Sequence, residues 1–342
     1  ADDPAHQDVE ASLDSGLQLE KRMAWRNYVY IALYLLLTLS ILGLTGRMFW
    51  WADYFAHPRL HLAAGLGLLA AIFLLMTDWM RLLAAILGVG LNIFAVFSAI
   101  PGDNNTLNAA VMPPGQLRVA TVNVGTIIPD SATFEKWVRE THPDILVLVE
   151  ANAKWLPMLD KLLDVLPYQK IANHTSNYGL TILSRFPYDN LESGVAGPRS
   201  LPTMSAEMET PLGRLVLIAL HPNPPGAGDD GRARDMYLAQ IAAVAQTSSM
   251  PTLLVGDFNA TPWSSGFEPI RLLPNLQPAS TIIPPTWPAA LGQLGLPTQH
   301  ILLSIPYSKP RDLIFNQIQA TPAIEGMSHL PLVADLRVNV KQ

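Results

Sequence analysis

The chain has 342 residues, of which 49% are hydrophobic and only 15% are charged, and its mean hydropathy of +0.23 is high for a soluble protein. It contains no cysteine, which excludes disulfide bonds, a thiolate nucleophile and a Cys-ligated metal site. The net charge is −6 and the 22 Lys and Arg residues form no basic cluster. We therefore expect no nucleic-acid partner, because cations supply most of the affinity for a phosphate backbone.

Residues 1–27 form a polar leader that is rich in Asp and Glu. Val9, Leu13 and Leu17 recur in it at helical spacing, which weakly indicates an amphipathic helix. A charged leader of this kind is ordinarily disordered unless a partner holds it. The leader is therefore one segment through which we expect contact with another subunit.

Three apolar stretches follow, at residues 28–44, 60–76 and 82–100. Each approaches the ~20 residues that cross ~30 Å of hydrocarbon, and the aromatic residues 49–55 between the first two suit the headgroup level. We predict about three transmembrane helices within residues 28–100. The alternatives are buried helices of a soluble core and, for the first stretch, a signal peptide, which the long acidic leader and the lack of a small-residue cleavage site disfavour.

Basic residues near these stretches predict the orientation of the chain. Four lie on the side of the N-terminus and three on the other side, so the positive-inside rule places the N-terminus in the cytoplasm and the globular domain outside. The first group is Lys21, Arg22, Arg26 and Arg81, and the second is Arg47, Arg59 and Arg118.

Residues 101–116 are rich in Pro, Gly and Asn and are predicted to be a linker. In residues 117–342, short apolar runs alternate with helical patterns, which indicates a layered α/β domain whose sheets are covered on both faces. The predicted strands are 117–125, 144–150, 178–184, 214–221, 251–259, 300–304 and 330–338. The predicted helices are 131–141, 154–166 and 232–248.

Polar residues close several of these strands: Asn123, Glu150, His221, Asp257 and Asn259. Any one of them alone is more often a turn or helix cap than a functional group. As a set, one Glu, one Asp and two carboxamides can hold a hard divalent ion through oxygen ligands. Such an ion neutralises phosphoryl oxygens and helps to activate water.

The segments VNV, LVE, YGLTILSR, ALHP, GDFNATPWS and SHLPLVADL resemble the endonuclease/exonuclease/phosphatase superfamily over about residues 117–338. The resemblance is greatest to the bacterial members with N-terminal membrane helices. It implies a four-layer α/β sandwich, with two mixed β-sheets between helices, and Mg²⁺-dependent phosphoester hydrolysis. It also implies a multi-pass protein of the bacterial inner membrane.

The same resemblance implies a role for each matching residue. Glu150 would be the metal ligand, with Asn123 beside the metal. Asp257 would orient the attacking water, and Asn259 would hold both the phosphate and Asp257.

The resemblance also covers two histidines, and the sequence departs from the family pattern at two positions. His221 would face the same cleft, and His329 would contact a phosphoryl oxygen. The closing motif Ser-Asp-His of the family reads MSH here, with Ser328 at the acidic position. An earlier Ile-Asp-His reads TQH, with Gln299 in place of the acid.

Both departures remove negative charge from the expected site. Ser328 is neutral and too weak a base to help activate water. Gln299 can accept a hydrogen bond from His329 but cannot supply the charge that keeps an imidazole protonated. The alternative is that the motifs are displaced and that Asp312 or Glu325 supplies the missing acid.

Two functions remain open from the sequence. We favour a degenerate, non-catalytic subunit without a cofactor, which binds membrane lipids and other membrane protein subunits through its leader, helices and residues 49–55. The alternative is an active Mg- or Mn-dependent, membrane-anchored phosphodiesterase or phosphatase that acts on a small or lipid phosphate. The remaining histidines show no ligand spacing and are interpreted as structural or surface residues: His57, His61, His142, His174 and His300.

Overall fold

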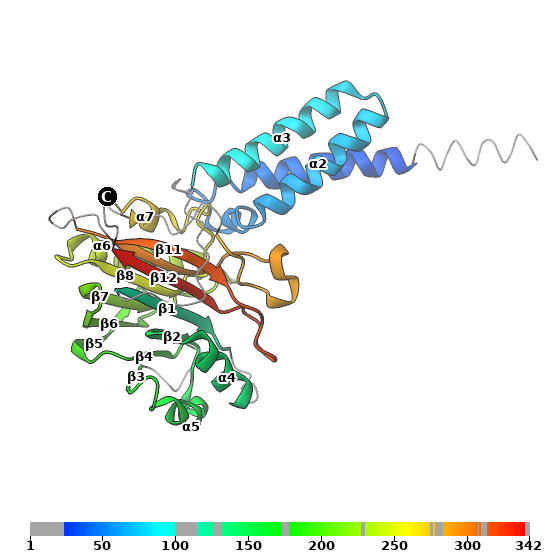
Figure 1. Cartoon of the computed structure of the whole chain (residues 1–342). Coiled ribbons are helices and arrows are strands. Elements are labelled where there is room, and N and C mark those ends of the chain that lie inside the picture. Colours follow the sequence, from blue (N-terminus) through cyan, green and yellow to red (C-terminus); the bar gives the residue numbers. More distant parts are fainter. Residues whose placement is uncertain are drawn as a thin grey trace, which may run out of the picture.

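The computed structural model describes residues 24–99, 115–125, 131–172, 178–226, 230–273, 276–277, 283–306, 308 and 313–338. Most of the predicted leader and nearly all of the predicted linker lie outside these residues. Figure 1 shows long helices near the N-terminus projecting from a β-rich body.

Three long helices and one 3-10 helix precede the sheets. The helix Ala24–Leu42 is followed by η1 (Trp50–Phe55), α2 (Arg59–Leu75) and α3 (Trp79–Phe97). Ala24–Leu42 and α3 are long and apolar enough to cross a membrane. The prediction of about three spans is corrected to two candidates, because α2 has 17 residues and measures only ~26 Å.

These helices bury only a narrow face. A small core that includes Leu33, Leu66 and Phe73 joins them, while 11% of the best apolar window of Ala24–Leu42 and 22% of that of α3 are buried. Large apolar side chains point away from the protein, among them Leu87 and Phe94 of α3. A monomeric soluble protein rarely exposes an apolar surface of this size.

The first sheet has six strands in the order β11-β12-β1-β2-β4-β3. Its central strands β1 and β2 run parallel, whereas its other pairs are antiparallel. The strands are β1 (Gln116–Asn123), β2 (Ile145–Val149), β3 (Tyr168–Ala172), β4 (Leu180–Ser184), β11 (Leu313–Ala320) and β12 (Leu332–Val338).

The second sheet also has six strands, in the order β5-β6-β7-β8-β10-β9. Here β7 and β8 form the parallel pair. The strands are β5 (Tyr188–Ala196), β6 (Leu201–Thr210), β7 (Gly213–Leu220), β8 (Thr252–Asp257), β9 (Leu276–Gln277) and β10 (Gln299–Ser304). The predicted α/β fold with two mixed sheets is therefore confirmed.

Helices and short helical turns connect the strands. The α-helices are α4 (Ser131–Thr141), α5 (Leu156–Leu159), α6 (Asp230–Thr247) and α7 (Glu268–Arg271), and the 3-10 helices are η2 (Ala153–Trp155), η3 (Asp160–Leu162) and η4 (Ala289–Leu294). The helix predicted over 154–166 is broken into η2, α5 and η3.

Three apolar cores hold these elements together. One combines residues of both sheets, such as Val147 of β2 and Leu217 of β7. A second joins the first sheet to Phe134 of α4 and Trp155 of η2, and a third joins the second sheet to Leu238 of α6. Both sheets are thus buried on two sides, which explains why their central strands are apolar almost throughout.

Candidate functional site

The strand ends of both sheets bring the predicted polar residues together. Asn123 is the last residue of β1, Glu150 follows β2, His221 follows β7 and Asp257 is the last residue of β8. Parallel neighbours end at the same edge of a sheet, and the two sheets face one another across a shared core. Residues from four strands therefore meet at one place.

Asn123 joins the two carboxylates. Its Nδ2 donates hydrogen bonds to Glu150 Oε1 at 2.8 Å and to Asp257 Oδ2 at 3.0 Å. Its Oδ1 accepts a hydrogen bond from the backbone N–H of Gly125 at 3.0 Å, which fixes the side chain. One amide nitrogen therefore holds two acidic groups close together.

A histidine flanks each carboxylate. His221 Nε2 lies 3.4 Å from Glu150 Oε1, and His329 Nδ1 lies 3.6 Å from Asp257 Oδ2. Both imidazoles are buried. Among the described residues, His329 Nδ1 has no hydrogen-bond partner, which leaves a buried polar atom available beside Asp257.

The surroundings keep both acids ionised at neutral pH. Burial alone would raise the pKa of Glu150, but the hydrogen bond to His221 and the His221 charge, with the bond from Asn123, hold that pKa below its ordinary value. Burial likewise opposes ionisation of Asp257, but His329, His221 and Asn123 lower its pKa overall. Burial lowers the pKa of His329 more than the acids raise it, so this imidazole is neutral at pH 7.

Backbone geometry fixes the acidic residues. Asn259 has a left-handed φ of 49°, which lets its N–H donate to Asp257 Oδ1 at 3.0 Å while its Nδ2 donates to the Pro222 carbonyl at 3.0 Å. Glu150 is also left-handed, with a φ of 66°. Such conformations cost about 1–3 kcal/mol in non-glycine residues and concentrate at functional sites.

Gln299 does not have the interaction expected from the sequence. Its Oε1 accepts a hydrogen bond from the backbone N–H of Asn123 at 2.8 Å, and its Nε2 donates to the Leu330 carbonyl at 2.9 Å. The amide is fully buried and is occupied at both ends, so it does not accept a hydrogen bond from His329. The carboxylate that faces His329 belongs to Asp257 instead.

Neither Ser328 nor Glu325 supplies a buried acid beside these residues. Ser328 is exposed, and its hydroxyl lies 3.9 Å from the point that a Cβ on Gly125 would occupy. Glu325 is exposed as well, whereas Asp312 lies outside the described residues.

A cavity of ≈ 530 Å³ opens beside this cluster. Its polar lining contains Asn123, Glu150, Asn259 and His329 together with Thr298, and its other sides are mostly apolar, whereas Asp257 and His221 are buried and do not line it. Three lining residues, Tyr54, His57 and Pro58, come from the segment that precedes α2. The full lining is Tyr54, His57, Pro58, Asn123, Glu150, Pro224, Pro225, Asn259, Trp287, Leu296, Thr298 and His329.

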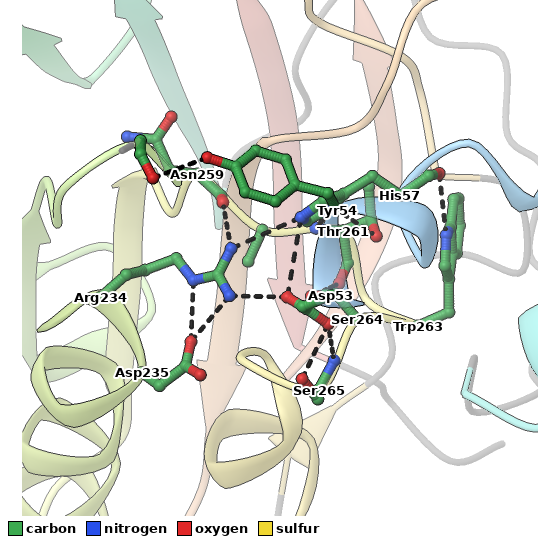
Figure 2. Close-up of polar contacts among 12 residues, drawn as sticks. Asp53, Tyr54, His57, Arg234, Asp235, Asn259, Thr261, Trp263, Ser264 and Ser265 are labelled. Carbon is green, nitrogen blue, oxygen red and sulfur yellow. Dashed lines mark hydrogen bonds and ion pairs between the residues drawn. The ribbon is translucent and has the colours of Figure 1, made fainter. Parts of the chain in front are cut away.

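A buried ion pair attaches this segment to the β-rich body (Figure 2). Asp53 Oδ2 lies 2.6 Å from Arg234 Nη2, and Asp53 Oδ1 accepts hydrogen bonds from the backbone and hydroxyl of Ser265, both at 2.7 Å. Arg234 also pairs with Asp235 and donates from Nη1 to the Asn259 carbonyl at 3.1 Å. Asp53, which precedes α2, is thus two contacts away from the turn that fixes Asp257.

His57 and Tyr54 add further polar contacts to this junction. His57 Nδ1 lies 3.1 Å from Thr261 Oγ1, and the His57 carbonyl accepts a hydrogen bond from Trp263 Nε1 at 3.1 Å. The Tyr54 hydroxyl donates to the Gly226 carbonyl at 2.9 Å. The first half of the segment GDFNATPWSS therefore supplies Asp257 and the cavity-lining Asn259, and its second half contacts residues 53–57.

The donor chemistry of the site suits a hard divalent ion with few protein ligands. No group of three or more His, Asp or Glu side chains in the described part of the chain is arranged to hold a metal. Mg²⁺, however, is commonly held by one or two carboxylates together with water and substrate phosphate. Glu150, which lines the cavity and is ionised, fits that pattern.

The fold and this constellation are those of a phosphoesterase-like α/β protein. The model of the Endonuclease/Exonuclease/phosphatase family matches residues 120–310, more than half of the chain, and the chain belongs to this family.

Solved structures agree with this fold. A humanized D. rerio TDP2 matches with a TM-score of 0.56 at 13% identity, over 65% of this chain and 99% of that chain. A Bacteroides vulgatus endonuclease/exonuclease/phosphatase matches with a TM-score of 0.51 at 15% identity, over 65% and 99%. A conserved Enterococcus faecalis V583 protein of unknown function matches with a TM-score of 0.52 at 14% identity, over 65% and 100%. No curated protein sequence matches the chain significantly.

Proposed function

We propose that this protein is a membrane-anchored, divalent-metal-dependent phosphoester hydrolase. The observation that carries the proposal is the convergence of Glu150 and Asp257 on one nitrogen of Asn123, with a histidine beside each acid, next to an open cavity that Asn123, Glu150 and His329 line. Membership of the family supports the same reaction class.

Each side chain has a role in this proposal. Glu150 holds a Mg²⁺ or Mn²⁺ ion, which when bound neutralises phosphoryl charge and makes water more acidic. Asn123 keeps Glu150 and Asp257 at a fixed separation through its two hydrogen bonds. Asp257 is ionised and accepts the proton of the attacking water, as a general base does.

The remaining residues position these groups and the phosphate. The backbone N–H of Asn259 holds Oδ1 of Asp257 and Asn123 Nδ2 holds Oδ2, so the carboxylate has a fixed orientation for its contact with water. His329, which lines the cavity, hydrogen-bonds a phosphoryl oxygen. His221 orients Glu150 from the opposite side.

We also infer that the apolar helices anchor the protein in a bacterial inner membrane. Their exposed apolar faces favour lipid, and α2 can cross if the bilayer thins slightly to meet its shorter length. With α2 as a third crossing, the positive-inside rule favours an N-terminus in the cytoplasm and a β-rich body outside. The proposed four-layer order is supported by the three cores, of which one combines residues of both sheets and the other two each join one sheet to helices.

The test is hydrolysis of bis-p-nitrophenyl phosphate by the purified full chain in detergent with Mg²⁺ or Mn²⁺. We expect metal-dependent activity that Asp257→Ala abolishes. Glu192→Gln removes an exposed acid on β5 and should leave activity unchanged. A folded protein without metal-dependent hydrolysis would reject the proposal.

One observation favours a second candidate, the non-catalytic subunit of a larger membrane assembly. The side chain of Gln299 hydrogen-bonds two backbone groups, the N–H of Asn123 and the carbonyl of Leu330, and Ser328 is uncharged. The site therefore has fewer acids than the family pattern. Such a subunit would bind lipids and other membrane proteins and would not bind nucleic acid. It would show no hydrolysis and would copurify with a partner after gentle solubilisation.

A further inference from the structure

We propose that the substrate is a phosphate ester of a membrane lipid, whose hydrocarbon portion leaves the bilayer along the cavity wall built by Tyr54 and Pro58. This inference rests on the proposed hydrolase function and names its substrate class. It starts from where the cavity lies in the chain. Pro58 lines the cavity and is also the N-cap of α2, so the mouth of the site adjoins the first residue of an apolar helix.

The chemistry of the wall suits hydrocarbon better than a polyanion. Above the carboxylates the lining consists of Tyr54, Pro58, Pro224, Pro225, Trp287 and Leu296. Among the described lining residues none is Lys or Arg, the side chains that recognise multiply charged phosphates. Apolar walls with a few polar groups at one end are typical of sites that orient an amphiphile.

Exposed apolar side chains lie on the segment that joins two lining residues, Trp287 and Leu296, and this segment is called the rim of the cavity below. Trp287 is 42% exposed, and Leu291 and Leu294 of η4 are 52% and 67% exposed. The Leu294 carbonyl lies 2.7 Å from His61 Nε2, in the first turn of α2. These side chains therefore lie at the height of the membrane surface, where apolar and aromatic residues enter the headgroup layer.

The segment that leads to the lining residue Tyr54 also exposes apolar side chains. Met48, Phe49 and Trp51 are exposed on the segment that enters η1. This segment cannot move away from the body without breaking the buried pair of Asp53 with Arg234. The cavity is therefore held at a fixed height above the bilayer, which lets a lipid headgroup reach the site while the hydrocarbon next to it lies along the apolar wall.

The reaction is a hydrolysis that needs no further reactant besides water. Water adds to phosphorus, the bond between phosphorus and the lipid oxygen breaks, and the proton of the water passes to Asp257. The leaving oxygen takes up a proton to become the lipid alcohol. The phosphate product, which lacks hydrocarbon, then dissolves in water.

The experiment compares a lipid ester with a soluble ester of the same phosphate. The full chain is reconstituted into phosphatidylcholine vesicles that contain dioleoyl phosphatidic acid, and phosphate release is compared with that from glycerol 3-phosphate. The bilayer holds the enzyme and the lipid on one surface, which raises the effective concentration of the lipid at the site. We therefore expect kcat/KM for the lipid to exceed that for glycerol 3-phosphate on the order of 100-fold. Equal or better turnover of the soluble ester would overturn the inference.

A rim variant supplies the matched control. Leu291→Ser with Leu294→Ser should lower turnover of the vesicle lipid severalfold and leave the soluble p-nitrophenyl ester unchanged. Leu163→Ser replaces a leucine that is 48% exposed and remote from the cavity lining, and it should change neither rate. Loss of the soluble activity in the rim variant, or no effect on the lipid, would contradict the inference.

Binding separates this inference from the proposed function. Asp257→Asn, which cannot take up the proton, is titrated in detergent with dioleoyl phosphatidic acid and with glycerol 3-phosphate. If the variant binds the lipid at least about tenfold more tightly than glycerol 3-phosphate but the unaltered chain hydrolyses no ester, the lipid site stands and the hydrolase function is rejected. If the unaltered chain hydrolyses the p-nitrophenyl ester but the variant shows no preference for the lipid, the hydrolase function stands and the lipid substrate is rejected. If neither hydrolysis nor a lipid preference is found, both proposals are rejected.

Discussion

The carboxylate of Asp53 lies 2.6 Å from the guanidinium of Arg234, and both side chains are almost completely buried. Asp53 belongs to η1, between two apolar helices, whereas Arg234 belongs to α6 beside the second sheet. The same guanidinium holds the carbonyl of Asn259, whose N–H fixes Asp257. The membrane-side segment is therefore part of the scaffold of the site as well as an attachment.

Asp53→Ala should loosen this junction. It leaves Arg234 buried with only Asp235 as an acidic partner, and breaking a buried pair costs about 3–5 kcal/mol. We expect a lower thermal unfolding midpoint in detergent and a loss of turnover. Asp189→Asn, which alters an exposed ion pair, should shift the midpoint little. Equal shifts for the two variants would show that the buried pair does not hold the parts together.

The junction should weaken in mild acid. Burial lowers the pKa of His57 from 6.5 to about 4. The negative charge of Asp53 raises this pKa and the positive charge of Arg234 lowers it, but burial has the largest effect. The unfolded chain therefore takes up a proton near pH 6.5 while the folded chain does not. Stability is fully present above pH 6.5 and falls as the pH drops toward 4, by up to about 3 kcal/mol.

Unfolding midpoints between pH 7.5 and pH 5 test this dependence. Asp53 has a lowered pKa and titrates below this pH range. His300 is buried with a pKa of about 4, so it also makes stability fall as the pH drops. His57→Gln should therefore retain only part of the pH dependence. The same slope in His57→Gln and in the unaltered chain would assign the effect to other groups.

Gln299→Asp should destabilise the protein and leave activity low. A carboxylate cannot donate to the Leu330 carbonyl, and its shorter side chain draws back from the Asn123 N–H that Gln299 now binds. An unsatisfied buried group costs about 1–3 kcal/mol. Denaturant unfolding and the p-nitrophenyl assay measure the two effects. Higher activity of Gln299→Asp at unchanged stability would contradict this prediction, because it would show that the hydrogen bonds of Gln299 are not needed for stability and that an acid at this position restores catalysis.

Ser328→Asp should behave in the opposite way. The position is exposed beside Gly125, so a carboxylate there stays hydrated and adds negative charge near Glu150. We expect a severalfold lower Mg²⁺ concentration for half-maximal activity with little change in stability. A Mg²⁺ titration of the rate, with Ser328→Asn as the uncharged control, checks the prediction, and equal titration curves for the two variants would contradict it.

The parts of this fold that could be predicted from sequence are those with an apolar pattern of their own. All seven predicted strands form, because each is buried on both faces. Five strands escaped prediction. Four of them, β3, β5, β9 and β11, lie at sheet edges, and β5 (YDNLESGVA) is largely exposed. The fifth, β6 (LPTMSAEMET), lies inside the second sheet, but polar residues interrupt its apolar pattern. The predicted helix over 154–166 is interrupted, and Pro157 lies in the first turn of its central piece.

The candidate site divides in the same way. Asn123, Glu150, His221 and Asp257 each close an apolar strand, so a local signal marks them. Tyr54 and His57 line the same cavity, yet His57 touches Thr261 across 204 positions of sequence. No local pattern predicts such a contact, and His57 was accordingly interpreted as a structural or surface residue.

The most direct test of the account is phosphate release from a vesicle-borne lipid phosphate by the full chain with Mg²⁺, measured beside Asp257→Asn. The Asn side chain can still accept the hydrogen bond from the Asn259 N–H, so the variant should remain folded. We expect metal-dependent release by the unaltered chain at least about 1,000-fold faster than by Asp257→Asn, since Asp257 takes the proton of the attacking water. Equal rates for two folded proteins, or no release by either, would contradict it.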